Sequence, residues 1–197
     1  SLDVIHLNGE ATVLLMAADI TERKQAQRRI SYLARLYATL SQVNQTIVRV
    51  TDQTELFNAI CQVAVDYGEF KLAWIGLYDA ASGQVTPVAD YGKNVPPEFR
   101  QVLDLTQEPL LSSTLAVAIL NDQVEVNNDV RQATRSVPWR ELAAQLGHQS
   151  SAAIPLHRQG QVVGVLNLYA ADINFFAVEE EQKLLIEMGI DISYALD

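Results

Sequence analysis

Two pairs of apolar runs, each joined by a short glycine-containing turn, constrain the fold of this chain more than any other feature. The first pair covers residues 71–79 and 84–91, and the second covers residues 150–158 and 161–170. Runs of this length, bounded by turn residues, are typical of strands. Strands that are joined by tight turns pair antiparallel. We therefore expect a central antiparallel β-sheet.

Helical stretches enclose these strands. Apolar residues recur with a helical period over residues 23–50, over 51–68 and over 178–196. The second stretch has Asp52 as its expected N-cap and Gly68 as its expected stop signal. Helices that are segregated at the ends of the chain can cover one face of the sheet. The sequence thus predicts an α+β fold.

The segment between the two strand pairs, residues 92–147, is rich in Asn, Asp and Pro. Within it we expect short helices at 98–103, 113–120 and 138–146, and a short strand at 124–126. A long irregular segment inside a compact domain is usually functional. We expect it to cover the other face of the sheet.

Residues 1–18 read as a β-hairpin that turns at Asn8 and Gly9. A lone hairpin is marginal in water, and the chain begins inside a β pattern, so we expect it to be a piece of a longer protein. The expected organisation is a domain remnant at 1–22, a linker helix at 23–50 and a complete domain at 51–197.

The linker helix carries a stripe of alternating three- and four-residue steps that resembles a heptad seam. A second apolar stripe, Leu36, Val43 and Val50, runs beside it. The two stripes either face the helix's own domain and a second subunit, or form one broad buried face. We expect a homodimer through the N- and C-terminal helices. The candidate dimer residues are Ile30, Leu33, Tyr37, Leu40, Asn44 and Ile47.

The formal charge of −10 repels phosphate backbones and anionic lipid, so we expect neither nucleic-acid binding nor membrane contact by this segment. No apolar run approaches the roughly 20 residues that span a bilayer. The single cysteine, Cys61, excludes an internal disulfide and suits a reducing compartment. These features predict a cytoplasmic location.

The sequence offers no catalytic constellation. It has no glycine-rich phosphate loop, its three histidines lack metal-ligand spacing, and Cys61 reads as a small buried hydrophobe within a helix. His148 is the one candidate haem or metal ligand, and its other interpretation is a surface or hydrogen-bonding histidine. We expect no enzyme activity, and assign no catalytic residue, no metal site and no cofactor.

Strand alternation predicts a pocket on one face of the sheet. Trp74, Gly76 and Tyr78 share a face of their strand, as do Asn167 and Tyr169. Aromatic walls with a few polar groups suit an unidentified small molecule; alternatively, the aromatics fill the interior and no ligand binds. The candidate ligand-binding residues are Trp74, Tyr78, Phe99, Trp139, Asn167 and Tyr169.

Two parts of the chain resemble known families. The sequence LMAADITERK at residues 15–24 resembles the exit of PAS domains, where the last strand leads into a signalling helix. Residues from about 40 to 197 resemble the GAF family, and in particular a subgroup common in bacterial multidomain sensors. The segments that carry the resemblance are LAWIGLY at 72–78, VEVNND at 124–129, PWRELA at 138–143, GHQSSAAIPL at 147–156 and GVLNLY at 164–169.

The resemblance implies a sensory module that passes a ligand or PAS signal through dimeric helices. In similar proteins the output is a diguanylate cyclase (GGDEF), often with a cyclic-di-GMP phosphodiesterase (EAL), or a histidine kinase; a dimerisation scaffold without ligand is the alternative. The chain departs from relatives at 111–115, where a glycine- and proline-rich turn is common. It also lacks the N-K-F-D-E motif of cyclic-nucleotide-binding relatives and the several cysteines of methionine sulfoxide reductases.

Overall fold

The computed structural model describes the backbone of residues 2–7, 10–15, 20–93, 95, 97–132 and 137–197. Side chains are described within these ranges from residue 20 onward, except at 21, 25, 28 and 137–139. The chain divides into two compact units, Ser1–Tyr32 and Leu33–Asp197.

The first unit contains the expected hairpin. Strand β1 (Leu2–Leu7) pairs antiparallel with β2 (Glu10–Leu15), and Leu7 lies opposite Glu10. Asn8 and Gly9, the expected turn, lie outside the described residues, as do residues 16–19 of the junction that resembles a PAS exit.

Helix α1 (Thr21–Arg49) confirms the long helix expected over 23–50. Within the second unit one side of it is buried: Leu36 and Val43 are fully enclosed. Arg35 on the same helix forms an ion pair with Glu69. The stripe of Leu36 and Val43 therefore faces the helix's own domain.

Helix α2 (Gln53–Gly68) begins as expected, with the Asp52 carboxylate accepting a hydrogen bond from the Glu55 N–H at 2.9 Å. The helix ends at Gly68 as expected, but the left-handed residue that follows the end is Glu69, whose φ is 56°, and not the glycine. Gly68 is required for close packing instead. A Cβ there would lie 2.6 Å from the Phe70 ring and 3.0 Å from the Thr39 hydroxyl.

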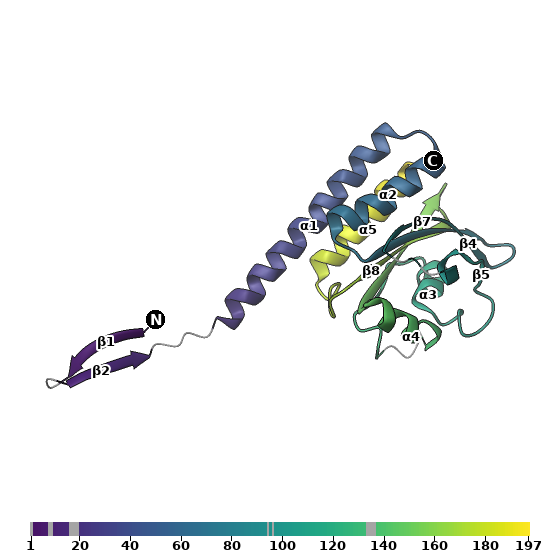
Figure 1. The fold of residues 1–197 in the computed structure, drawn as a ribbon. Coiled ribbons are helices and arrows are strands. Elements are labelled where there is room, and N and C mark those ends of the chain that lie inside the picture. Colours follow the sequence, from purple (N-terminus) through teal and green to yellow (C-terminus); the bar gives the residue numbers. More distant parts are fainter. Residues whose placement is uncertain (1, 8–9, 16–19, 94, 96, 133–136) are drawn as a thin grey trace. The chain divides into compact units, whose positions relative to one another are not determined.

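A six-stranded antiparallel sheet forms the centre of the second unit, in the order β5-β4-β3-β8-β7-β6 (Figure 1). Both expected strand pairs are present, and they meet where β3 pairs with β8. Trp74 on β3 lies opposite Asn167 on β8, and Leu72 lies opposite Tyr169. The strands are β3 (Leu72–Asp79), β4 (Gln84–Gly92), β5 (Leu103–Asp104), β6 (Glu125–Asn127), β7 (Ser150–Arg158) and β8 (Gln161–Ala170).

The helix expected at 98–103 is only partly present. A 3₁₀ turn, η1 (Pro97–Arg100), occupies its first part, and Leu103 instead enters strand β5 opposite Val85. A two-residue strand is too short to show a period in the sequence, so the signal for it was absent.

Helices α1, α2 and α5 (Glu179–Tyr194) lie on one face of the sheet, and α3 (Thr114–Asn121) and α4 (Val137–Leu146) lie on the other (Figure 1). This arrangement confirms the expected α+β fold with terminal helices on one side and irregular cover on the other. Among the described residues, no helix combines the length and apolar character that crossing a membrane requires.

Candidate functional site

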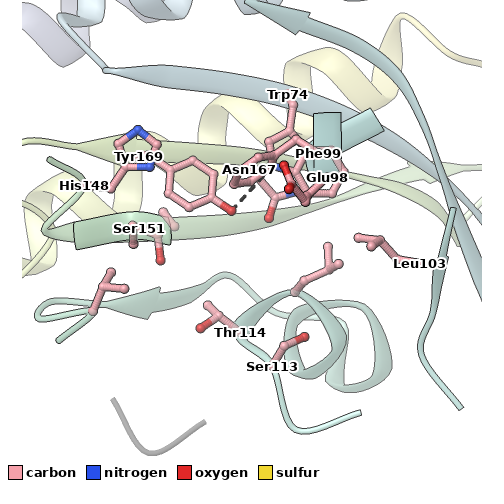
Figure 2. Close-up of a pocket in the computed structure, with 14 residues that line it drawn as sticks. Trp74, Glu98, Phe99, Leu103, Ser113, Thr114, His148, Ser151, Asn167 and Tyr169 are labelled. Carbon is pink, nitrogen blue, oxygen red and sulfur yellow. Dashed lines mark hydrogen bonds between the residues drawn. The ribbon is translucent and has the colours of Figure 1, made fainter. Parts of the chain in front are cut away.

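A cavity of about 50 Å³ lies between the sheet and its irregular cover (Figure 2). Strands β3, β7 and β8 form one side of it, and η1 and α3 contribute to the other. Its lining residues are Trp74, Glu98, Phe99, Leu103, Ser113, Thr114, Leu115, Val130, Ala143, His148, Ser151, Ala152, Asn167 and Tyr169.

Three aromatic rings line this cavity, those of Trp74 and Tyr169 from the sheet and that of Phe99 from η1. The Trp74 and Phe99 rings lie 6.3 Å apart and the Phe99 and Tyr169 rings 5.5 Å apart, both edge to face. The Trp74 indole Nε1 donates to the Tyr169 hydroxyl at 3.5 Å (Figure 2). The rings therefore hold one another in place and leave the phenol hydroxyl at the cavity.

His148 is held at the cavity by the end of α4. Its backbone N–H donates to the Ala143 carbonyl at 2.8 Å, and its ring lies 4.9 Å from the Tyr169 ring. The side chain is buried, and its Nδ1 has no hydrogen-bond partner. Burial, helped by the positive charge of Lys71, lowers the pKa of His148 to about 4, so the imidazole is neutral at physiological pH.

Asn167 and Tyr169 place polar groups on the β8 side of the cavity. Asn167 is buried, and its Nδ2 has no hydrogen-bond partner. Burial raises the pKa of Tyr169 to about 12, against the weaker opposing effect of the Trp74 hydrogen bond. The phenol therefore keeps its proton and acts as a donor.

The first turn of α3 borders the same cavity through Ser113 and Thr114. The Ser113 hydroxyl caps the helix by accepting from the Ala116 N–H at 3.2 Å. Among the described residues that line the cavity, Glu98 is the only charged one, and it is exposed. The site is thus largely apolar, with a few uncharged polar groups.

The structure brings together four of the six predicted ligand-binding residues, namely Trp74, Phe99, Asn167 and Tyr169. Tyr78 packs against the same core cluster but does not line the cavity. Trp139 belongs to the first turn of α4, and its side chain lies outside the described residues.

The sequence presents His148 either as a candidate haem or metal ligand or as a surface or hydrogen-bonding histidine, and Ser151 is absent from the predicted site. Strand alternation, applied to β7 as it was to β3 and β8, places Ser151 and Ala153 on the pocket face. No group of three or more His, Cys, Asp or Glu residues that could hold a metal ion occurs in the part of the chain that the structure describes.

Cys61 does not line the cavity. It is fully buried on α2, and burial, followed by the negative charge of Asp90, raises its pKa far above the ordinary range of a thiol. The protonated thiol is a poor nucleophile. Cys61 therefore serves as a core residue.

The strand that lines the cavity also contacts the C-terminal helix. On β7, the backbone N–H of His157 donates to the Ser193 hydroxyl of α5 at 2.9 Å, and that hydroxyl donates to the Gly189 carbonyl at 2.6 Å. Further along, Arg158 Nε donates to the Leu196 carbonyl at 2.7 Å. A displacement of β7 would therefore also change the position of α5.

The candidate dimer residues differ in exposure. Tyr37 and Asn44 are exposed, Leu33 and Ile47 are half-buried, and Leu40 is buried within its own domain. Ile30 is exposed. An open groove of about 630 Å³ on the outer side of α1 is lined by Tyr37, Leu40, Ser41, Asn44, Gln45, Val48 and Arg49.

Two solved structures of named proteins share this architecture. The free methionine-R-sulfoxide reductase of Neisseria meningitidis superposes with a TM-score of 0.68 at 16% identity, covering 83% of this chain and 89% of that one. The nlh2 GAF domain of A. aeolicus gives a TM-score of 0.67 at 10% identity, covering 82% and 95%. At these identities the likeness shows the fold alone.

Among curated proteins, the bacterioopsin transcriptional activator of Halobacterium salinarum is 27% identical over 179 residues. The match covers 87% of this chain but only 25% of that protein, so the chain spans about a quarter of its relative's length. Residues 50–197 match the model of the family described as GAF domain, and the chain belongs to that family.

Proposed function

We propose that this chain is a sensory module in which a small molecule in the cavity biases the position of α5. GAF domains are regulatory modules, and the curated relative is named as a transcriptional activator. The observation that carries the proposal is that β7 lines the cavity with Ser151 and Ala152 and contacts α5 through His157. The same strand thus contacts both the cavity and the C-terminal helix.

The coupling requires only a modest energy difference between two states. A ligand that favours one arrangement of β7 by a few kcal/mol shifts most of the population. Ile154 on β7 also packs closely on α5, because a Cβ at Gly189 would lie 2.6 Å from the Ile154 Cγ2. A small movement of β7 would therefore displace α5, because the contact between them leaves no space to take up the movement.

The output would act through a homodimer that uses the outer faces of α1 and α5. Tyr37 and Val48 on α1, and Ile190 and Tyr194 on α5, are all more than half exposed. Large apolar side chains gathered at helical spacing favour association with a second copy. Asn44, which is exposed between Tyr37 and Val48, would fix the register of such a pair.

In the full-length protein, the resemblance to PAS and GAF segments of bacterial sensors favours an output in cyclic-di-GMP turnover or in a histidine kinase. The relative named as a transcriptional activator makes control of transcription a further candidate output. The sequence of the gene beyond Asp197 distinguishes these outputs.

Methionine sulfoxide reduction, the activity for which the Neisseria meningitidis neighbour is named, is not the activity that we propose. That chemistry needs thiols that attack and resolve. Cys61 is the only cysteine in the chain, and it is buried away from the cavity with a raised pKa. Incubation with free methionine sulfoxide and a thiol reductant should therefore produce no methionine.

A dimerisation scaffold with an inert interior is the second candidate function. The small volume of the cavity favours it, because about 50 Å³ lies well below the roughly 300 Å³ at which drug-sized ligand pockets begin. Either the cavity takes a very small ligand or it holds only water.

A fragment panel distinguishes the two functions. The chain, labelled with ¹⁵N, is titrated with small molecules of varied charge, and amide shifts are followed at the cavity and on α5. Sensing predicts that some compound shifts cavity residues together with Gly189 and Ser193. A panel without hits, or hits that leave α5 unchanged, would leave the scaffold as the function.

A further inference from the structure

Two buried nitrogen atoms at the cavity have no hydrogen-bond partner among the residues that the structure describes. They are Nδ1 of His148 and Nδ2 of Asn167, and both residues are 4% exposed. Buried polar atoms in folded proteins are nearly always satisfied, by protein groups, water or ligand. Since both residues line one cavity, what the cavity contains can supply the partners that the described residues do not.

The polar groups at this cavity are mainly donors. Asn167 Nδ2 carries hydrogens, and the Tyr169 hydroxyl, which accepts from Trp74, has a hydrogen of its own to donate. The N-terminal turn of α3, which also lines the cavity, favours partial negative charge. A carbonyl oxygen can accept from Asn167 Nδ2 and from the Tyr169 hydroxyl, and an amide N–H can donate to His148 Nδ1 in the tautomer that carries its hydrogen on Nε2.

Among the described lining residues, no cation offers a counterion to a full negative charge; Lys71, whose charge acts on His148, does not line the cavity. His148 is neutral at physiological pH, and Glu98 is the only charged group among the described lining residues. The chain as a whole carries a charge of −10. An anion would be buried without a partner, which is strongly unfavourable.

A cation meets the opposite difficulty. The rings of Trp74, Phe99 and Tyr169 and the carboxylate of Glu98 would attract it, but it has no acceptor to offer to Asn167 Nδ2 or to the Tyr169 hydroxyl. The donors would then stay unsatisfied. A small, planar, uncharged ligand with one acceptor oxygen suits both the rings and the donors.

We propose that the cavity binds a small uncharged carbonyl compound, of the amide or urea class, and excludes the corresponding carboxylate. The proposal rests on the proposed function, because it names the class of ligand for the same cavity. The volume of about 50 Å³ has room for roughly three or four water molecules, which sets the size of the ligand.

Three probes of one shape test the charge of the ligand directly. Acetamide, acetate and acetamidinium share the same planar skeleton but are neutral, negative and positive at neutral pH. Each is titrated into the ¹⁵N-labelled full chain, with amide shifts followed at His148, Asn167 and Tyr169. Acetamide should bind with a dissociation constant on the order of millimolar, as suits so few atoms, and acetate at least tenfold more weakly.

Variants connect the binding to the named donors. Asn167→Leu keeps the size of the side chain but removes the amide, and it should weaken acetamide at least tenfold. Asn58→Leu, at an exposed position of α2, should leave binding unchanged. Tyr169→Phe removes only a hydroxyl and serves as the second test if Asn167→Leu does not fold.

Each other outcome overturns the proposal. Acetate or acetamidinium binding as tightly as acetamide would show that charge is not selected, although the cavity would remain a ligand site. No shift with any probe would show that water alone satisfies the two nitrogens. In that case the fragment panel still decides the proposed function, since a hit of another class would preserve sensing while this ligand class fails.

Discussion

The backbone N–H of His157 on β7 donates to the side-chain hydroxyl of Ser193 on α5 at 2.9 Å. Ser193 is nearly buried, and its hydroxyl in turn donates to the Gly189 carbonyl one helical turn earlier. A single hydroxyl therefore joins the strand that borders the cavity to the helix that ends the domain.

Removing the Ser193 hydroxyl should weaken the attachment of α5 to β7. Ser193→Ala leaves the His157 N–H without its acceptor and should lower the free energy of unfolding by about 1 kcal/mol. The control Thr54→Ala, at an exposed position of α2, should change it by less than about 0.5 kcal/mol. Urea unfolding of both variants measures the difference, and equal effects would show that the bond does not hold α5.

Gly189→Ala tests how closely α5 approaches β7. At an open helix position this change stabilises by up to about 1 kcal/mol. Here the new Cβ would lie 2.6 Å from the Ile154 Cγ2, so we expect a loss of about 1–3 kcal/mol.

Combining Gly189→Ala with two substitutions of Ile154 tests whether the new Cβ clashes with the Ile154 Cγ2. Ile154→Val retains the Cγ2 and should give no relief, whereas Ile154→Ala removes it and should make the double variant less than additive by about 1 kcal/mol. Thermal unfolding of the singles and doubles measures this coupling. Strict additivity in both backgrounds would contradict the predicted contact.

Much of this architecture follows from the periods of the sequence. The boundaries of β7 and β8 were predicted residue for residue, because alternation and the Gln159-Gly160 turn define them locally. By contrast, β5 exists only through its pairing with Val85, and Gly68 is explained by the packing of Thr39 and Phe70. Neither relationship leaves a local signal.

The candidate site could likewise be predicted only in part, namely where its residues lie on strands. Trp74, Asn167 and Tyr169 could be placed by alternation along a strand, since alternate side chains share a face. His148 could not, because its burial depends on how the end of α4 meets the Tyr169 ring. A residue that follows a helix has no period from which its direction can be read.

The lowered pKa of His148 predicts a dependence of stability on pH. An unfolded histidine titrates near 6.5 and the folded one at about 4. Between these values the unfolded chain binds a proton that the folded chain does not, so stability falls as the pH drops from about 6.5 toward 4. The total loss approaches roughly 3 kcal/mol.

The variant His148→Gln isolates this contribution. Its pH profile of unfolding free energy should run parallel to that of the unmodified chain above about pH 7 and lie progressively higher, relative to it, as the pH falls below 6. Chemical denaturation at a series of pH values measures both curves. Parallel curves down to about pH 4.5 would show that His148 is protonated in the folded chain.

Asn167→Leu should stabilise the unliganded chain. The amide Nδ2 is buried without a partner, which costs about 1–3 kcal/mol, and an apolar side chain of similar size removes that cost. A gain of about 1 kcal/mol in urea unfolding, combined with lost acetamide binding, would mark a site that sacrifices stability for recognition. A destabilised variant would show instead that water already satisfies the amide.

The outer face of α1 should control the oligomeric state. Tyr37 is 60% exposed and Val48 85%, and both border the same open groove. We expect the full chain to sediment as a dimer at micromolar concentration, and the double variant Tyr37→Glu/Val48→Glu as a monomer, because paired carboxylates across the seam repel one another. Tyr67→Glu introduces a carboxylate at a position 49% exposed on α2, away from the groove, and should leave the dimer intact. A chain that sediments as a monomer without any substitution would remove the basis for signalling through paired helices, while the coupling of the cavity to α5 within one copy would still stand.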